Sequence, residues 1–392
     1  MNFIFFSVHF PDFIRHFSYH LRQAGANVLG IGDTDYQALD DRLKGSLTDY
    51  YKVDNLENYD EVIRAVGYFT FKYGKIDRIE SLNEHWLEME AQIRMDFNIE
   101  GVKPDEIENF RRKSRMKQFF KKSVVKTIPY IHGLTGEKIK EFAARQGFPV
   151  IVKPDKGSGA NMTFKLTDES EIDEFIQNVP DHADFIAEKF VDGIIVTYDG
   201  LTGRDGEVLF ESSTTYEQSI MDVVNHDNHV HYVTMAQIPE DVRDAGRKIM
   251  KAYGAKEKFF HIELFRSRKN QEIIALEVNM RPPGAWMTDA INFTHDMDIY
   301  REWANMIMRG EIGGPFTGKY FTAYASRKSH KDYLFGHAEV IDQLNGKLVR
   351  HEAIAPVFSR AMGNYAYQFR SESLEEVRQL IKMIHEERPH ED

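Results

Sequence analysis

Apolar residues recur at two different spacings along the first hundred residues of the chain. Short apolar runs at residues 2–8, 27–32 and 76–82 have the length and composition of buried strands. Between and after them, residues 11–24, 59–73 and 84–97 place apolar side chains every third or fourth position, which predicts helices. Strands that alternate with helices predict a parallel, doubly wound α/β sheet.

Ligands of such a sheet bind beyond the carboxyl ends of its strands. Asp33 and the pair Asn83–Glu84 follow predicted strands and are expected at that edge, although their residue types alone assign them no role. No G-x-G-x-x-G sequence follows the first strand, so a dinucleotide is not indicated.

The middle of the chain begins with a strongly basic helix, predicted over residues 105–122, whose apolar face carries Met116, Phe119 and Phe120. On charge pattern alone, such a run is usually a solvated helix face. A strand at 128–131 and a helix at 135–146 follow, and an apolar strand at 150–152 then leads into Lys153 and Pro154.

A loop with two glycines, Gly157 and Gly159, connects that strand to another at 162–166. Glycines let the backbone approach a phosphate and present N–H groups to it. The loop lacks the GK[ST] of a P-loop, and taken alone it favours an ordinary glycine hairpin, with phosphate binding as the alternative.

The second half of the chain mixes strands and helices without strict alternation. We expect a helix at 168–178, strands at 184–191, 194–198 and 208–212, and a helix at 240–253. One long helix is expected over 288–309, followed by a glycine-rich boundary at 310–318. The last segment, with strands near 320–325, 338–344 and 366–370 and a helix at 374–385, predicts a small α+β lobe.

Residues 258–284 predict an antiparallel hairpin with a polar turn at 267–271. Glu263 lies in its first strand, and Glu277, Asn279 and Arg281 alternate in the second, so these last three share one face. The intervening residues Leu276, Val278 and Met280 are expected on the opposite, core face.

Two carboxylates and an amide oxygen are ligands suited to Mg²⁺, which shares its coordination shell with waters and substrate phosphates. Arg281 beside them suits a phosphate or a carboxylate. A solvent-facing edge hairpin with hydrated charges remains the alternative.

Three histidines, His226, His229 and His231, lie close together in a polar segment. A zinc site requires three or four ligands on a rigid frame. The residues between these histidines are typical of a loop, so a mobile loop over a site is the favoured interpretation, with metal binding as the alternative.

Composition narrows the class of protein. The chain has 392 residues, enough for two or three domains, and a net charge of −12, which argues against a nucleic-acid-binding protein. It has no cysteine, and therefore no disulfide, thiolate nucleophile or zinc–thiolate site. The N-terminus lacks the features of a signal peptide, and no apolar run approaches the roughly 20 residues of a membrane helix. No membrane partner is indicated, and a cytoplasmic location is expected by default.

The order of these features resembles the ATP-grasp superfamily, in its branch of carboxylate–amine ligases, biotin carboxylases and carbamoyl phosphate synthetases. The resemblance rests on the basic helix, Val-Lys-Pro, the glycine loop, Ala-Glu-Lys-Phe-Val-Asp-Gly, His-Ile-Glu-Leu and Leu-Glu-Val-Asn-Met-Arg-Pro, in that order. The stretch NEHWLEMEAQIRMDFNIEG before RRKSRMKQFF is also typical of the family. The resemblance implies a pre-ATP-grasp domain at 1–104, an ATP-grasp domain at 105–314 with lobes 105–187 and 188–314, and a C-terminal α+β lobe at 315–392.

The resemblance also implies roles for individual residues. Lys113 and Lys153 match the two phosphate-binding lysines, and Gly157 and Gly159 match the loop that closes over the triphosphate. Glu188 would meet the adenine amino group, while the backbones of Lys189 and Val191 would contact the edge of the ring. Glu263, Glu277 and Asn279 match the metal ligands, and Arg281 matches an arginine at the γ-phosphate or the acyl-phosphate.

The chain departs from the family at one position. Many relatives place a glutamate for the ribose where this chain has Ile195, and Asp199, on the same face of a regular strand, is the candidate substitute. No motif for a biotin-carrying lysine is found.

The implied activity is that of an ADP-forming ligase that uses ATP and Mg²⁺, or Mn²⁺, to activate a carboxylate as an acyl-phosphate for attack by an amine. A small carboxylate and an amine would be the substrates, with Trp286 and the 226–231 loop flanking the acceptor and the helix expected from Thr288 holding an anionic group; a homodimer is possible. The alternatives are a carboxylating or kinase-like enzyme of the same fold and a non-catalytic nucleotide-binding subunit.

Overall fold

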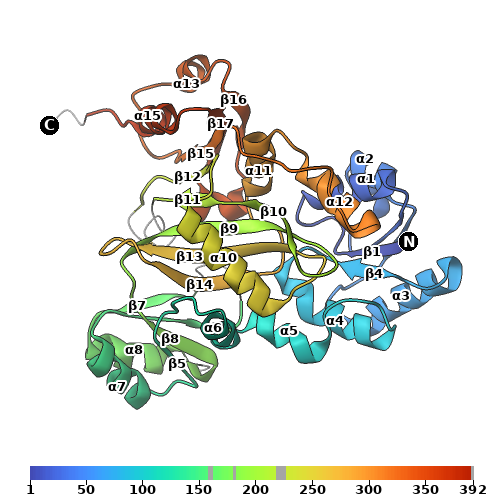
Figure 1. Cartoon of the computed structure of the whole chain (residues 1–392), viewed down its shortest axis with the longest axis horizontal. Coiled ribbons are helices and arrows are strands. Elements are labelled where there is room, and N and C mark those ends of the chain that lie inside the picture. The colour runs from blue at the N-terminus through green and yellow to red at the C-terminus, as the bar shows by residue number, and fades with distance from the viewer. Residues whose placement is uncertain (158–161, 180–181, 218–226, 390–392) are drawn as a thin grey trace.

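The structure is a computed structural model that describes residues 1–157, 162–179, 182–217 and 227–389. Three β-sheets organise it (Figure 1), with strand orders β3-β2-β1-β4, β5-β8-β6-β7 and β14-β13-β9-β11-β12-β15-β17-β16. The strand β10 pairs with β9 beside this last path. The fold is therefore mixed α/β and α+β, as the sequence predicts.

The N-terminal sheet is parallel throughout its described pairs, which confirms the predicted doubly wound arrangement. Its elements are β1 (Asn2–Phe6), α1 (Ile14–Gln23), β2 (Asn27–Gly32), η1 (Tyr36–Ala38), α2 (Asp41–Ser46), β3 (Asp49–Lys52), α3 (Tyr59–Tyr73), β4 (Arg78–Glu80), η2 (Glu84–Trp86) and α4 (Leu87–Asp96). Alternate residues of β1 enter two cores: Phe3 and Phe5 pack with Trp303 from far along the chain, whereas Ile4 and Phe6 pack with Phe69.

The basic segment predicted as one helix over 105–122 forms two: α5 (Pro104–Arg111) and α6 (Lys113–Lys122). The backbone of Arg112 is extended, with φ −94° and ψ 120°, and this ends the first helix. Asp155 stabilises the break, because its carboxylate accepts hydrogen bonds from the backbone N–H and the hydroxyl of Ser114, both at 2.7 Å. The break puts Lys113 at the first turn of a new helix.

The second sheet is antiparallel and carries two helices. Its elements are β5 (Tyr130–His132), α7 (Gly136–Gln146), β6 (Val150–Pro154), β7 (Phe164–Leu166), α8 (Glu169–Asn178), η3 (His182–Asp184) and β8 (Phe185–Lys189). The helix predicted at 168–178 is confirmed, and Asp168 caps it by accepting from the N–H groups of Ser170 and Glu171.

The third sheet has nine strands and runs through the rest of the chain. Its first part comprises β9 (Gly193–Thr202), β10 (Val208–Ser212), β11 (Thr214–Tyr216), β12 (His231–Thr234), α10 (Glu240–Tyr253), β13 (Phe259–Ser267) and β14 (Ile273–Asn279). The C-terminal strands β15 (Phe321–Arg327), β16 (Leu348–Ala353) and β17 (Tyr365–Ser371) continue the same sheet through the pairing of β12 with β15. Because of this pairing, the C-terminal strands share the sheet of the preceding domain. The helix α15 (Leu374–His385) packs on β15 and β17.

Two further predicted elements are wrong. The long helix expected over 288–309 is two helices, α11 (Met287–His295) and α12 (Ile299–Arg309), because Asp296 is left-handed (φ 48°) and its carboxylate pairs with Lys319 and Arg370. The strand expected at 338–344 is the helix α13 (His337–Gln343), whose buried Val340 and the following Leu344 lie four residues apart, a helical spacing. The short elements η4 (Pro356–Phe358) and α14 (Ser359–Met362) were not foreseen from the sequence.

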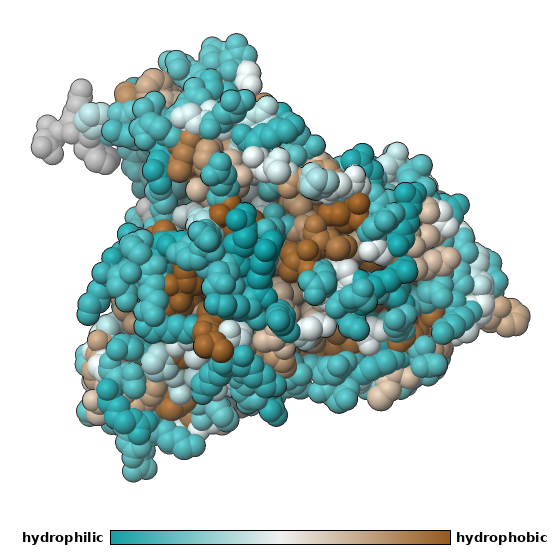
Figure 2. Space-filling model, in the orientation of Figure 1, coloured by the Kyte–Doolittle hydropathy of each residue, from teal (hydrophilic) through white to brown (hydrophobic). Residues whose placement is uncertain are grey.

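The face of the molecule in Figure 2 is mostly hydrophilic, with apolar side chains in small, separate areas. Within the described ranges, no helix combines the length and the apolar character needed to span a membrane.

Candidate functional site

The predicted hairpin forms, and it brings Glu263 and Glu277 directly opposite each other in the register of β13 and β14. The register shifts immediately afterwards, so that Leu264 pairs with Ala275 and Leu276 has no opposite residue. This β-bulge turns Leu276 away from the expected face: it packs with Ile128, whereas Val278 and Met280 enter another core. The prediction that Leu276 shares the face of Val278 and Met280 is therefore wrong.

The two opposed carboxylates have unequal acidity. Burial raises the pKa of Glu277, Lys113 lowers it and Glu263 raises it again, and the balance leaves it above its ordinary value. Burial also acts to raise the pKa of Glu263, but His261 and Arg281 hold it below its ordinary value. Two like charges directly across a strand pair destabilise it, so this pair is typical of a site that binds cations.

His261 connects Glu263 to the strand behind it. Its Nδ1 lies 2.5 Å from Asp199 and its Nε2 lies 3.3 Å from Glu263. Burial acts to lower the pKa of His261, but Asp199 and Glu263 raise it to about 9, so the imidazole is charged at neutral pH. No role was predicted for His261 from the sequence, although its place two residues before Glu263 puts both on one strand face.

Asp199, the candidate ribose ligand, is fully buried in β9. Its two oxygens are occupied by His261 and by the hydroxyl of Thr197, which donates to it at 2.5 Å. Ile195 lies on the same strand and is half-buried. Asp199 thus supports the Glu263 side of the site through His261.

Lys113 and the start of the glycine loop are in contact. The Lys113 Nζ donates to the carbonyl of Gly157 at 2.7 Å, and the Lys113 backbone N–H donates to the carbonyl of Asp155 at 2.9 Å. Gly157 has φ 109°, a conformation that favours glycine. Gly159 lies outside the described residues.

Glu188, at the end of β8, lies between two lysines. Its oxygens are 2.8 Å from Nζ of Lys153 and 2.6 Å from Nζ of Lys117. Burial acts to raise the pKa of Glu188, but these two lysines lower it to about 2. Lys117 was missed from the sequence; its position one helical turn after Lys113 was the available signal.

The segment that follows Glu188 lies beside a small apolar cluster. Lys189 is exposed and its N–H donates to the carbonyl of Pro129 at 3.0 Å. Val191 packs with Ile128 and Leu276. The bulge residue Leu276 therefore reaches the segment that follows β8, the strand that carries Glu188.

Asn279 is the last residue of β14, and Arg281 lies two residues beyond it, so the prediction that Arg281 belongs to this strand is wrong. Asn279 is buried opposite His261, and the Arg281 guanidinium donates to the carbonyl of Pro282 at 2.9 Å. Its other terminal nitrogen lies 3.4 Å from the carboxylate of Glu84, a residue of the N-terminal domain. The position of Asn83–Glu84 after β4, expected from the sequence to be a strand end, thus brings Glu84 to the hairpin.

The histidines of residues 226–231 do not gather at the hairpin. His226 lies outside the described residues, and His229 stacks on His385 of the C-terminal helix with ring centroids 4.5 Å apart. His231 lies 3.4 Å from Glu217. Among the residues that the structure describes, no group of three or more His, Asp or Glu side chains is arranged to hold a metal.

Trp286, the other residue expected near an acceptor, is the N-cap residue of α11 and lies under the guanidinium of Arg350, 4.1 Å from its ring centroid. Thr288, from which a helix was expected, lies in the first turn of α11 and donates to the carbonyl of Pro283 at 3.3 Å.

Comparison with known proteins identifies the fold. Residues 146–289 match the family model described as an ATP-grasp domain. The L-amino acid ligase of Bacillus licheniformis has a similar structure, with a TM-score of 0.72, 16% sequence identity and coverage of 97% of this chain and 96% of that chain. No curated protein matches the chain.

Two further solved structures span nearly the whole chain. The biotin carboxylase domain of the Hydrogenobacter thermophilus 2-oxoglutarate carboxylase, in complex with MgADP, ADP and bicarbonate, has a TM-score of 0.69 at 14% identity, covering 96% of this chain and 89% of that one. N5-carboxyaminoimidazole synthetase from Staphylococcus aureus has a TM-score of 0.69 at 13% identity, covering 97% and 96%. This chain therefore contains an ATP-grasp domain and has the ATP-grasp fold, which confirms the resemblance seen in the sequence.

Proposed function

We propose that the protein is an ATP- and Mg²⁺-dependent, ADP-forming ligase that activates a small carboxylate as an acyl-phosphate for attack by an amine. The observation that carries the proposal is the pairing of Glu263 with Glu277 across β13 and β14, together with Lys113 and Lys153, whose charges both act on Glu277. The similarity to solved ATP-grasp ligases and to a carboxylase domain holding MgADP supports the same class of reaction.

The nucleotide would lie between the second and third sheets. Lys113 and Lys153 would neutralise the phosphates as compact charges, and the loop of Gly157 and Gly159 would close over them. Glu188 would accept from the adenine amino group, and the backbones of Lys189 and Val191 would contact the ring edge. The apolar cluster of Val191, Ile128 and Leu276 supports this position, because it provides a hydrophobic surface next to Glu188.

Glu263, Glu277 and Asn279 would hold the metal. Their donor set of two carboxylates and an amide oxygen fits Mg²⁺ or Mn²⁺, which would take further ligands from water and phosphate. The raised pKa of Glu277 fits too, since an opposed carboxylate without a cation holds its proton more tightly. Bound metal would neutralise charge on the transferring phosphoryl group.

The other catalytic contributions of the side chains would be to position the substrates and to stabilise the charge of the reacting phosphoryl group. Arg281 and Lys153 would stabilise the transferring phosphoryl group and the acyl-phosphate while the substrate carboxylate attacks the γ-phosphate and ADP leaves. An amine would then attack the acyl carbon and displace phosphate. No side-chain nucleophile is required, which agrees with a chain that has no cysteine.

A screen for ADP release over pairs of carboxylates and amines, with Mg·ATP, tests the proposal. The wild type should release ADP with one or more pairs, and Glu277→Gln should abolish release while circular dichroism and the unfolding midpoint stay unchanged. Glu272→Gln, at a half-buried glutamate that precedes the same strand and pairs with Lys126, is the matched control and should keep full activity. If Glu277→Gln turns over at the wild-type rate, the metal assignment is wrong.

A carboxylating enzyme is the second candidate, because one similar structure is a biotin carboxylase domain in complex with bicarbonate. Trapping with hydroxylamine distinguishes the two, since an organic acyl-phosphate yields a stable hydroxamate. Dependence of ADP release on bicarbonate alone would favour carboxylation.

A further inference from the structure

Glu84 is a buried carboxylate that has a single, long ionic contact. The residue is 5% exposed, and Arg281, at 3.4 Å, is its ion-pair partner within the part of the chain that the structure describes. Charge-assisted hydrogen bonds are usually about 2.7–2.9 Å long, and a carboxylate has about four acceptor positions. Removing a carboxylate from water without satisfying it is unfavourable, so Glu84 retains capacity for a cationic partner.

Among the described residues, the ion-pair contact of Glu84 is made with Arg281 beside the hairpin and not within the domain of Glu84 itself. Arg281 lies two residues after Asn279, where β14 ends. Glu84 and Arg281 therefore form a pair of opposite charges next to the two carboxylates of the hairpin.

The turn that presents Glu84 is built before any substrate binds. Glu90, which is fully buried, accepts from the backbone N–H of Ser81 at 2.7 Å, and Asn83 accepts from the N–H of His85 at 3.0 Å. Leu82 has φ 55°, a strained conformation for a leucine that these hydrogen bonds stabilise. A substrate contact on such a turn would be pre-organised.

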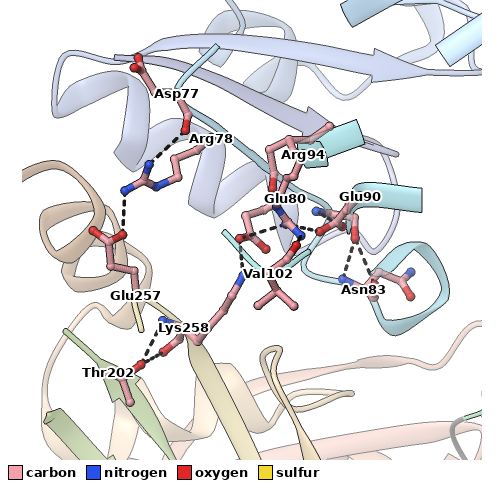
Figure 3. Close-up of polar contacts among 12 residues, drawn as sticks. Asp77, Arg78, Glu80, Asn83, Glu90, Arg94, Val102, Thr202, Glu257 and Lys258 are labelled. Carbon is pink, nitrogen blue, oxygen red and sulfur yellow. Dashed lines mark hydrogen bonds and ion pairs between the residues drawn. The ribbon is translucent and has the colours of Figure 1, made fainter. Parts of the chain in front are cut away.

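The same turn is fixed to the ATP-grasp sheet. Arg94 lies 2.6 Å from Glu90 and 3.3 Å from Glu80, and Glu80 in turn pairs with Lys258, the residue before β13 (Figure 3). Arg78 reaches Glu257 at 2.7 Å beside it. These contacts hold the N-terminal domain in one position relative to the hairpin, and so hold Glu84 in one position relative to Arg281.

We infer, building on the proposed function, that Glu84 binds the ammonium group of the substrate whose carboxylate is activated, while Arg281 binds that carboxylate. The substrate class is then an amino acid with its amino group on the first or second carbon from the carboxylate. The carboxylate of Glu84 and the guanidinium of Arg281 lie 3.4 Å apart. Only in such an amino acid are the ammonium and carboxylate groups close enough together to contact both of these side chains. Acids without an amino group would leave Glu84 buried beside an apolar group.

Binding and turnover should be measured together, for the wild type, Glu84→Gln and the exposed-site control Glu207→Gln. Calorimetric titration of the common L-amino acids into protein saturated with Mg·ADP reports binding without turnover. Steady-state ADP release, with matched acids that lack the amino group, reports KM and kcat. Glu84→Gln should weaken binding of the amino acid, and raise its KM, by about 10- to 100-fold, as expected for loss of a charge-assisted hydrogen bond. The KM for ATP and the affinity for Mg·ADP should not change.

Each contrary result has a distinct meaning. Amino-acid binding that depends on Glu84 without ADP release would support the ammonium site and contradict the ligase proposal. Equal use of acids with and without an amino group, unaffected by Glu84→Gln, would overturn the ammonium site and leave the ligase standing. If Glu84→Gln changes only kcat or the KM for ATP, Glu84 orients Arg281 and does not bind the ammonium group. Absence of amino-acid binding to the wild type would also overturn the inference.

Discussion

The carboxylate of Glu188 lies 2.8 Å from Nζ of Lys153 and 2.6 Å from Nζ of Lys117, and all three side chains are largely or wholly buried. Lys153 comes from the neighbouring strand and Lys117 from a helix, so one carboxylate neutralises cations from two elements. Breaking a buried ion pair by removing one partner is strongly destabilising, because the other charge stays buried.

Glu188→Gln should therefore lower the free energy of unfolding by about 3 kcal/mol, as measured by urea denaturation. The double variant Glu188→Gln/Lys117→Met should recover part of this loss, since it also removes the unpaired charge. Glu207→Gln should change stability by less than about 0.5 kcal/mol, as surface substitutions do. A loss for Glu188→Gln no larger than that of the control would contradict the buried ion pair.

Lys113→Ala should weaken the binding of Mg·ADP by about 10- to 100-fold, because one charge-assisted contact with phosphate is lost. The fold should persist, since the break before α6 is held by Asp155 and Ser114 rather than by the lysine side chain. Calorimetric titration of Mg·ADP measures the change. Lys122→Ala, an exposed lysine of the same helix, is the matched control, and equal affinities for the two variants would remove Lys113 from the phosphate site.

The sequence predicted the site best where the chain is regular. Alternation along a strand has a period of two, so Glu277 and Asn279 could be assigned to one face of β14 without a structure, whereas Arg281 lies beyond the end of that strand. The family resemblance supplied the roles that are proposed for Lys113 and Lys153. The doubly wound N-terminal sheet followed from its alternating elements in the same way.

The remaining features depend on tertiary contacts. Leu276 leaves its face because of a bulge, which no residue type marks, and Arg112 ends a helix because Asp155, far along the chain, caps the next one. Lys117 could not be distinguished from the solvated lysines around it until Glu188 was placed beside it. Glu84 reaches Arg281 only because the two domains dock.

Lys258→Met should show how firmly the N-terminal domain is held. Lys258 is buried and pairs with Glu80, so the variant leaves that carboxylate with Arg94 alone. We expect a loss of about 2–3 kcal/mol in unfolding free energy, and a raised KM for the carboxylate substrate because Glu84 is then less well positioned. Lys256→Met, two residues away and exposed, should show neither effect. An unchanged substrate KM in a clearly destabilised Lys258→Met would separate domain docking from substrate binding.

His229 should make the stability of the C-terminal region depend on pH. Its ring stacks on that of His385, and Lys331 and Lys328 lie near it with Glu387. Burial, and to a smaller extent the charge of Lys331, lowers the pKa of His229 to about 4. Burial, and to a smaller extent His229, lowers the pKa of His385. Both rings are therefore neutral in the folded state and gain protons on unfolding once the pH falls below about 6.5. The contribution of the two rings to the free energy of unfolding is fully present above that pH and is lost as the pH falls toward about 4, by an amount on the order of 1–2 kcal/mol.

Urea denaturation between pH 7 and pH 4.5 should show this loss for the wild type, and a shallower slope of unfolding free energy against pH for His229→Gln. His132→Gln, at an exposed histidine in β5, should keep the wild-type slope. If His229→Gln also keeps it, the stacked pair does not titrate on unfolding.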